Sequence, residues 1–145
     1  MNELAPTPHG THVLQRPTPR RAPLYPPCKN CAWYRHHTPV VSAFRELGVV
    51  FDVALAERAA RESGRAPVTF SWRRLRHYVS KDGVNTRHVA HVDRSKPGVM
   101  GTLRFKGRRR LVLIEGSHRA FGSVRDRESY NLHLLTEEET ARCLR

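Results

Sequence analysis

Cysteines, aromatic residues and long apolar runs are all scarce in this chain. It has 3 cysteines among 145 residues, and so small and odd a number excludes the disulfide framework of small secreted proteins. No apolar stretch approaches the roughly 20 residues of a membrane-spanning helix, and residues 1–21 lack the apolar segment of a secretory signal. These absences predict a cytoplasmic protein that has no membrane partner.

Acidic residues are scarce relative to basic ones. The chain has 13 of them against 26 lysines and arginines, which gives a formal net charge of +13 and a pI of about 11.0. Residues 65–110 concentrate the excess, with 13 basic and 2 acidic residues and hence a local net charge of +11. A positively charged surface binds polyanions such as nucleic acids, because each phosphate that it neutralises releases counterions. We therefore expect a nucleic-acid partner, with DNA preferred; an anionic small ligand and a merely solubilising surface are the alternatives.

The segment CKNCAWYRHH places two cysteines close to two histidines. Two thiolates and two imidazoles form one ligand set of structural zinc, and the candidates are Cys28, Cys31, His36 and His37. Adjacent histidines, however, point apart on a helix and on a strand alike. We predict no metal site and regard the cysteines as reduced thiols, with structural zinc as the open alternative.

Proline is concentrated at the N-terminal end, where residues 1–27 contain 7 of the 10. That segment has no apolar periodicity and cannot bury enough surface to offset the entropy cost of ordering. We expect residues 1–30 to form a disordered arm rich in proline and arginine, and residues 31–145 to form one domain. Within that domain we expect a helical part at 40–80 and a core at 85–145.

The helical part contains three predicted helices. Spacings of three and four relate the apolar residues of the first: Val40, Val41, Phe44 and Leu47. The second begins at an N-cap, Asp52, and ends at Gly64. The third, FSWRRLRHYVS (70–80), interleaves basic and apolar residues. It is either a packing helix with a charged outer side or the second member of a helix-turn-helix that enters a DNA groove.

The core alternates between strand and helix patterns. Strands are predicted in RHVAHVD (87–93), VMGTLRF (99–105), LVLIE (111–115) and YNLHLL (130–135). KGRRR is a tight basic turn, and LVLIE is expected to be central because it is apolar on both faces. Helices are predicted at 120–129 and from Thr136, whose capping-box partner is Glu139. The fold class is therefore α+β: a small mixed sheet with flanking helices, preceded by helices and the disordered arm.

The segment LVLIEGSHRA (111–120) brings several chemically active groups to the end of a buried strand. Gly116 lets a ligand oxygen approach the backbone, and the amides that follow at a helix N-terminus attract anions. Arg119 adds a forked donor suited to phosphate, Ser117 a hydroxyl and His118 an imidazole that moves protons near neutral pH. Glu115 can orient His118 or act as a base. We expect a phosphate or nucleotide site at Gly116, Ser117, His118 and Arg119; an ordinary turn with an exposed His-Arg pair is the alternative.

An ordered series of segments accompanies this motif. The segments HVD (91–93), KPGVM (96–100), LIEGSHRA (113–120), NLHLL (131–135) and TEEETARCL (136–144) follow one another along the chain. In that order they resemble the ParB/sulfiredoxin-like superfamily, also called the ParB-like nuclease domain, over about residues 85–144. The resemblance implies a ParB/sulfiredoxin-like fold for the core.

Activities differ among the branches of that superfamily. Partition-type members bind a nucleoside triphosphate at the corresponding loop and associate with DNA. The resemblance thus implies a nucleotide- and phosphate-binding domain that associates with DNA, with a nucleoside triphosphate as the ligand. We expect Mg²⁺ with that nucleotide where the same loop acts as an enzyme, because the ion neutralises phosphate charge. The alternative is a phosphoryl-transfer or phosphodiester-cleaving enzyme (a nuclease, an NTPase or a small-molecule kinase) in which Glu115 and His118 are catalytic. Sulfiredoxins have a cysteine where this chain has Ser117, so sulfiredoxin activity is not expected.

Three further polar residues lie on the strand predicted at 87–93. Alternation puts His91 and Asp93 on one face and His88 on the other, so we expect exposed residues and no shared site. The candidate nucleic-acid contacts are the arginines of the basic helix and of the hairpin tip: Arg73, Arg74, Arg76, Arg108, Arg109 and Arg110.

Overall fold

The computed structural model describes residues 41–80, 84 and 86–145. The predicted N-terminal arm lies outside these residues. The elements are, in chain order, β1 (Val41–Phe44), η1 (Arg45–Leu47), β2 (Val49–Asp52), α2 (Val53–Ser63), β3 (Val68–Phe70), α3 (Trp72–Leu75), α4 (Thr86–Val89), β4 (Gly98–Phe105), β5 (Arg108–Glu115), α5 (Ser117–Arg125), β6 (Tyr130–Leu134) and α6 (Glu137–Ala141). None of the helices in these ranges is long and apolar enough to cross a membrane.

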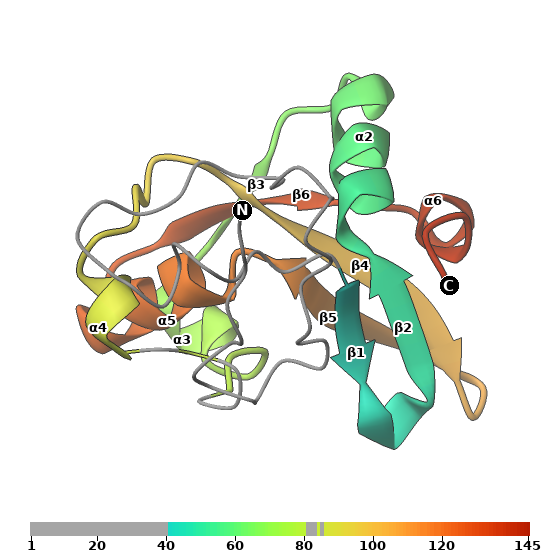
Figure 1. The fold of residues 1–145 in the computed structure, drawn as a ribbon, viewed down its shortest axis with the longest axis horizontal. Coiled ribbons are helices and arrows are strands. Elements are labelled where there is room, and N and C mark those ends of the chain that lie inside the picture. The colour runs from blue at the N-terminus through green and yellow to red at the C-terminus, as the bar shows by residue number, and fades with distance from the viewer. Residues whose placement is uncertain (1–40, 81–83, 85) are drawn as a thin grey trace, which may run out of the picture.

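Four strands form a mixed sheet in the order β3-β6-β4-β5 (Figure 1). β4 pairs antiparallel with β5 and parallel with β6, and β6 pairs antiparallel with β3. β1 and β2 form a separate antiparallel hairpin, which an isolated bridge between Phe51 and Leu144 ties to the C-terminal end. The predicted α+β class, with a small mixed sheet and flanking helices, is therefore confirmed.

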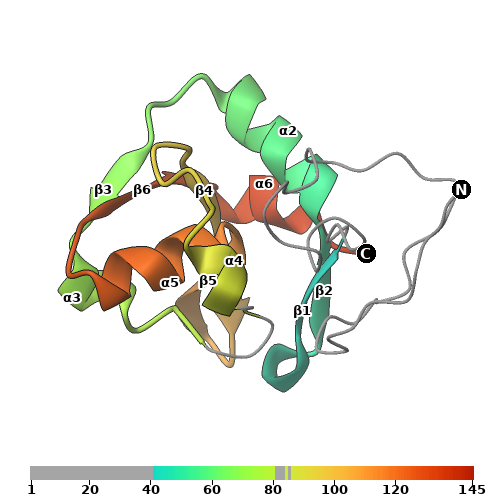
Figure 2. The same cartoon turned by 60° about the vertical axis from the view of Figure 1, so that its left-hand side comes forward.

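Helices lie on both sides of the sheet, with α3, α4 and α5 grouped on one side and α2 and α6 on the other (Figures 1 and 2). On the α2 side, Phe51, Ala56 and Ile114 belong to one buried cluster. On the α5 side, Met100 and Leu113 belong to a second buried cluster. Successive residues of a strand point to opposite faces, so β5 contributes to both clusters. The sheet is thus the middle of three layers.

The prediction that LVLIE forms a central strand is wrong. Among the described residues β5 pairs only with β4 and is therefore an edge strand. Both faces of this strand are nevertheless buried. Val112 packs in the cluster on the α2 side, and Leu113 packs in the cluster on the α5 side. A strand that is apolar on both faces is expected to be covered on both faces of its sheet. This pattern does not show whether other strands pair with both of its edges.

The helix predicted over 40–47 is also wrong where the structure describes it. Val41–Phe44 is a strand, and Gly48, in the left-handed conformation (φ 67°), ends the following 3-10 turn and leads into β2. Phe51 of β2 is fully buried, and its ring meets that of Phe44 edge-on with the centroids 5.8 Å apart. Strand pairing and burial of these rings outweigh a helical spacing in which two of the four residues are β-branched valines, whose helix propensity is modest.

Two further predictions fail between β3 and β4. Residues 87–93 do not form a strand; helix α4 covers their first part, and the adjacent His88 and Val89 are both buried. The basic helix shrinks to the four residues of α3, because Phe70 belongs to β3 and Ser71 caps the helix. Strand β3 separates α2 from α3, so these helices form no helix-turn-helix, and α3 is too short to read a major groove.

Local sequence signals located the remaining elements correctly. Asp52 caps α2 and accepts a hydrogen bond of 3.1 Å from a first-turn amide, and α6 begins with the predicted capping box of Thr136 and Glu139. β4 and β6 match their predicted strands, and α5 begins at Ser117 instead of residue 120. The hairpin reverses at residues 106–107, so the arginines of the predicted basic turn already belong to β5.

Candidate functional site

The loop predicted to bind phosphate joins the end of β5 to the start of α5. Gly116 is the N-cap residue with a left-handed backbone (φ 103°), and no side chain caps the helix. Ser117 and His118 are half-buried. The first hydrogen bond of the helix runs from the amide of Ala120 to the carbonyl of Gly116 at 2.8 Å. The positive end of the helix dipole therefore lies at this junction, as an anion site requires.

The backbone at Gly116 packs closely against two other segments. A Cβ placed there would lie 3.0 Å from the Cα of Gly98 and 3.0 Å from the hydroxyl oxygen of Tyr130. From the sequence, we expected a glycine here because it lets a ligand oxygen approach the backbone. Contacts within the chain already require it, because the space that a side chain would take is filled.

Arg119 and Glu115 form an ion pair across the first turn of α5. The guanidinium Nη2 of Arg119 donates to Oε2 of Glu115, and the two side chains are only 11% and 12% exposed. Taking two charges out of water costs free energy, which is recovered only while each has its partner. Arg119 therefore ties the strand end to the helix, and a phosphate at this loop would share the guanidinium with Glu115.

Three histidines meet beside this ion pair. The ring of His88 lies edge-on to the rings of His118 and His91, with centroid distances of 4.9 and 6.4 Å. His88 is only 5% exposed, and this burial lowers its pKa to about 4, with the nearby charges of His91 and Arg119 acting in the same direction. The prediction that His88 and His91 face apart is wrong, because a helical turn places residues three apart on one side.

Asp93 and Tyr130 complete the surroundings of the loop. Asp93 accepts hydrogen bonds from the hydroxyl and the amide of Ser95 at 2.6 and 3.0 Å, and these bonds lower its pKa. The hydroxyl of Tyr130 donates to the carbonyl of Lys96 at 2.8 Å, and burial raises the pKa of that hydroxyl far above neutral. Tyr130 is therefore a neutral donor that fixes the segment leading into β4 next to the loop.

The predicted nucleic-acid contacts lie in two separate groups. Arg108, Arg109 and Arg110, here called the tip arginines, are exposed at the tip of the β4–β5 hairpin. Arg73 and Arg74 belong to α3 and Arg76 directly follows it. Arg74 stacks over Phe70, whereas Arg73 and Arg76 lie at the ring of Trp72 near the C-terminal end of α5, at a distance from the hairpin tip (Figure 1). The basic surface is thus discontinuous along the sequence and in space.

Trp72, the first residue of α3, is surrounded by guanidinium groups. The Cζ atoms of Arg73, Arg127 and Arg76 lie 4.8, 5.6 and 6.0 Å from the centroid of the indole ring. Arg127 follows α5 in the chain and comes to this ring only through the packing of α3 on α5. We call these four residues the Trp72 cluster.

The tip arginines and the arginines of the Trp72 cluster differ in their acidic partners from six other arginines of the described residues. Ion pairs engage six arginines elsewhere: Arg65, Arg94, Arg104, Arg119, Arg125 and Arg145. Within the described ranges, no carboxylate lies within the 4.0 Å of an ion pair from any tip arginine or any arginine of the Trp72 cluster. Arg45, Arg58, Arg61, Arg74 and Arg142 likewise have no carboxylate of the described residues within this distance. Arg58 and Arg61 are flanked by Glu57 and Glu62 along α2, so the surface there carries both signs.

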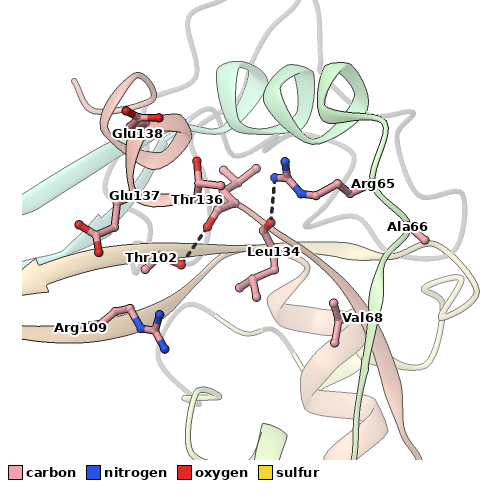
Figure 3. Close-up of a pocket in the computed structure, with 10 residues that line it drawn as sticks. Arg65, Ala66, Val68, Thr102, Arg109, Leu134, Thr136, Glu137 and Glu138 are labelled. Carbon is pink, nitrogen blue, oxygen red and sulfur yellow. Dashed lines mark hydrogen bonds between the residues drawn. The ribbon is translucent and has the colours of Figure 1, made fainter.

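A groove of about 550 Å³ lies beside the start of α6, away from the loop (Figure 3). Side chains from all four strands of the sheet line it together with residues of both charges: Arg65, Val68, Thr102, Arg109, Leu134 and Glu137. Its charged lining has both signs, so it lacks the excess of positive charge that a polyanion requires. We assign this groove no ligand.

No group of three or more His, Cys, Asp and Glu side chains in the described part of the chain is arranged to hold a metal ion. The zinc alternative concerns Cys28, Cys31, His36 and His37, which lie outside the described residues, so the prediction of reduced thiols and the zinc alternative both stay untested. Cys143 is buried, and this burial raises the pKa of its thiol, as is typical of a structural cysteine.

Comparison with known proteins identifies no family for this chain. No family model, curated protein or solved structure matches it. The ParB/sulfiredoxin-like resemblance therefore depends on the ordered motifs of the sequence, and what it implies about function is a proposal.

Sequence reasoning missed two groupings that the fold creates. The segment SWRRLR already places Trp72 among arginines, and that pattern is a usable signal for an aromatic and basic surface. Nothing in the sequence connects Arg127 with Trp72, or His88 with His118. These contacts arise from the packing of α3 and α4 on α5.

Proposed function

We propose that this protein associates with nucleic acid, in the first instance DNA, and binds a phosphate group of a nucleotide at the loop between β5 and α5. The observation that carries the proposal is that arginines without an acidic partner gather at two places, the hairpin tip and the ring of Trp72. The tip arginines and the Trp72 cluster have no acidic partner within the described ranges, whereas six arginines elsewhere do. Fixed positive charge without compensation favours a polyanionic partner.

The loop supports the second half of the proposal. The nine-residue helix α5 begins without a side-chain cap, and its first residues, Ser117 and His118, are half-buried. A hydroxyl, an imidazole and the positive end of a helix dipole together suit a phosphate oxygen. The resemblance to the ParB/sulfiredoxin-like superfamily suggests a nucleoside triphosphate as the ligand, which is an argument by analogy of fold.

Mg²⁺ is the ion expected beside a nucleoside triphosphate, but this loop does not fit a protein-bound metal well. Mg²⁺ usually takes one or two carboxylates in addition to phosphate oxygens. Glu115, the acid at the strand end, is engaged by Arg119. In this proposal, the hydrogen-bond donors of the chain therefore recognise the phosphate group.

An enzyme of phosphoryl transfer or phosphodiester cleavage is the second proposal, and the histidines beside the loop favour it. A histidine that acts as a general base has to be deprotonated at the working pH. The ring of His118 lies edge-on to that of His88, with the centroids 4.9 Å apart. Burial lowers the pKa of His88 to about 4, so this neighbour adds no positive charge beside His118 at neutral pH. In this alternative His118 accepts a proton from an attacking hydroxyl or water. Glu115, held by Arg119, orients the site.

The first test measures binding of a fluorescently labelled DNA duplex as the salt concentration rises. Replacing the three tip arginines by serine should lower the affinity at least about tenfold and reduce the slope of log K against log salt by about 0.9 for each phosphate that the variant no longer neutralises. The matched control replaces Arg58 and Arg61, which lie among acidic residues on α2, and should change the affinity little. Equal reductions in both variants, or no binding at low salt, would contradict the proposal.

A second test separates the loop from the basic surface. Labelled ATP, CTP and GTP are titrated against the wild type and against the conservative variant His118→Asn. The nucleotide-binding proposal expects saturable binding that the variant weakens, with duplex binding unchanged. The enzyme alternative expects the variant to lose product formation while it retains nucleotide affinity, and wild-type protein without any product excludes that alternative.

A further inference from the structure

We infer that the Trp72 cluster is a stacking platform for single-stranded nucleic acid. The inference rests on the proposed function, because it specifies the form of nucleic acid that this part of the basic surface holds. It concerns a site that lies at the opposite end of α5 from the phosphate loop (Figure 2).

The short helix that carries Trp72 is anchored in the fold. Ser71 caps α3 by accepting a hydrogen bond of 3.3 Å from the amide of Arg74, and Leu75 of the same short helix is fully buried in the core. Trp72 itself is half-buried, so one part of the ring packs against the protein and another part reaches the surface. An aromatic ring fixed in this way loses little entropy when a flat partner stacks on it.

The charges around the ring point to a polyanion. The three guanidinium groups of Arg73, Arg76 and Arg127 lie 4.8 to 6.0 Å from one ring centroid. Like charges gathered this closely repel one another, and no carboxylate of the described residues lies within ion-pair distance of them. Phosphate groups would remove this repulsion, while bases would stack on the indole or on the planar guanidinium groups.

A single strand fits this surface better than a duplex does. The bases of a duplex have their flat faces covered by neighbouring base pairs, so an aromatic ring on a protein surface reaches only their edges. Reading those edges takes an element that enters a groove, and α3, with four residues, is too short for that. Bases of a single strand offer their flat faces directly.

A purely structural role is the competing explanation. The guanidinium groups could serve only to fasten α3 to the turn after α5 through cation–π contacts. An acidic protein partner would likewise use the charges of the cluster. Under either explanation, the affinity for an oligonucleotide would not depend on its bases. A stacking platform, in contrast, requires them.

The experiment uses the full chain with the single replacement Trp33→Phe, so that Trp72 is the only tryptophan of the 2 in the sequence. Three probes are titrated: a 12-nucleotide thymidine strand, an abasic strand of equal length, and a 12-base-pair duplex. The thymidine strand should quench the Trp72 fluorescence and bind about tenfold more tightly than the abasic strand. A uridine strand distinguishes RNA from DNA as the natural source of such a ligand.

Two variants connect this preference with the cluster. Trp72→Leu should remove the advantage of the thymidine strand over the abasic strand, and Trp72→Phe should retain part of it; unfolding curves identify any variant that fails to fold. Arg127→Ser should weaken binding of both strands, whereas the control Arg125→Ser, at an arginine already engaged by Asp126, should not. Equal affinity for thymidine and abasic strands, or no quenching, overturns the inference. Duplex binding that depends on the tip arginines would then leave the proposed function standing, and absence of all binding would remove both.

Discussion

The two ends of α5 present arginine in opposite environments. At the N-terminal end, the side chain of Arg119 is 11% exposed and forms an ion pair with Glu115. At the C-terminal end, Arg127 is exposed and joins two other arginines around Trp72, with no acidic partner in the described part of the chain. A helix of nine residues is about 13 Å long, so the two environments are close neighbours.

This difference separates what an arginine does for the fold from what it offers to a partner. A buried guanidinium with a carboxylate partner is part of the structure, because removing either charge leaves the other without compensation. An exposed guanidinium without such a partner adds little to stability and much to the attraction of anions. The first prediction compares the two ends directly, and two more test how the N-terminal end is built into the fold.

The largest expected effect is at the ion pair. Arg119→Met should lower the free energy of unfolding by about 3 kcal/mol, because it leaves the carboxylate of Glu115 buried without its partner. The matched replacement Arg127→Met at the exposed end should cost no more than about 0.5 kcal/mol. Urea unfolding measures both.

A double variant sharpens this first prediction. Adding Glu115→Gln to Arg119→Met removes the isolated charge and should restore much of the missing stability. Equal effects of the single replacements at positions 119 and 127, or no recovery in the double variant, would mean that the pair does not hold the loop.

The second effect is a dependence of stability on pH. The folded protein keeps His88 neutral down to a pH of about 4, whereas the unfolded chain binds a proton at its ordinary pKa of 6.5. The contribution of His88 to stability is therefore complete above 6.5 and is lost as the pH falls toward 4. Between pH 7 and pH 5 the loss should be at most about 2 kcal/mol.

The variant His88→Gln tests this assignment by urea unfolding at the two pH values. It should abolish most of the pH dependence, whereas the control His77→Gln, at an exposed position, should retain it. A dependence that persists in His88→Gln would place the titrating group elsewhere, with the neighbouring imidazoles of His91 and His118 as the first candidates.

The smallest effect concerns Gly116. Replacing it by alanine should cost about 1–2 kcal/mol, since the left-handed backbone disfavours a side chain and the new Cβ would lie 3.0 Å from two other segments. Gly48 is the matched control, because its backbone is also left-handed but nothing lies within 4 Å of its Cβ position. The difference between the two unfolding free energies isolates the effect of packing. If the two variants are destabilised equally, packing against Gly98 and Tyr130 is unimportant.

The sequence predicted the elements that local interactions determine, and it failed for elements that depend on contacts between distant segments. The capping box at Thr136 and the N-cap at Asp52 are local, since each satisfies backbone amides within one turn, and both predictions are confirmed. The predictions over 40–47 and 87–93 failed because the periodicity of these segments is ambiguous and distant contacts decide their structure. Phe51 is buried against the C-terminal end, and His88 against α5.

By itself, the sequence determined the charge of this protein, the mixed α+β class and the position of a strand that runs into a helix at Gly116. These properties follow from composition and from interactions between near neighbours. Only the tertiary structure decided which arginines are engaged and which are open, which histidines meet, and that Trp72 and Arg127 come together from separate segments. The physical reason is that the exposure and compensation of a charge depend on groups distant in the chain, and packing alone brings those groups into contact.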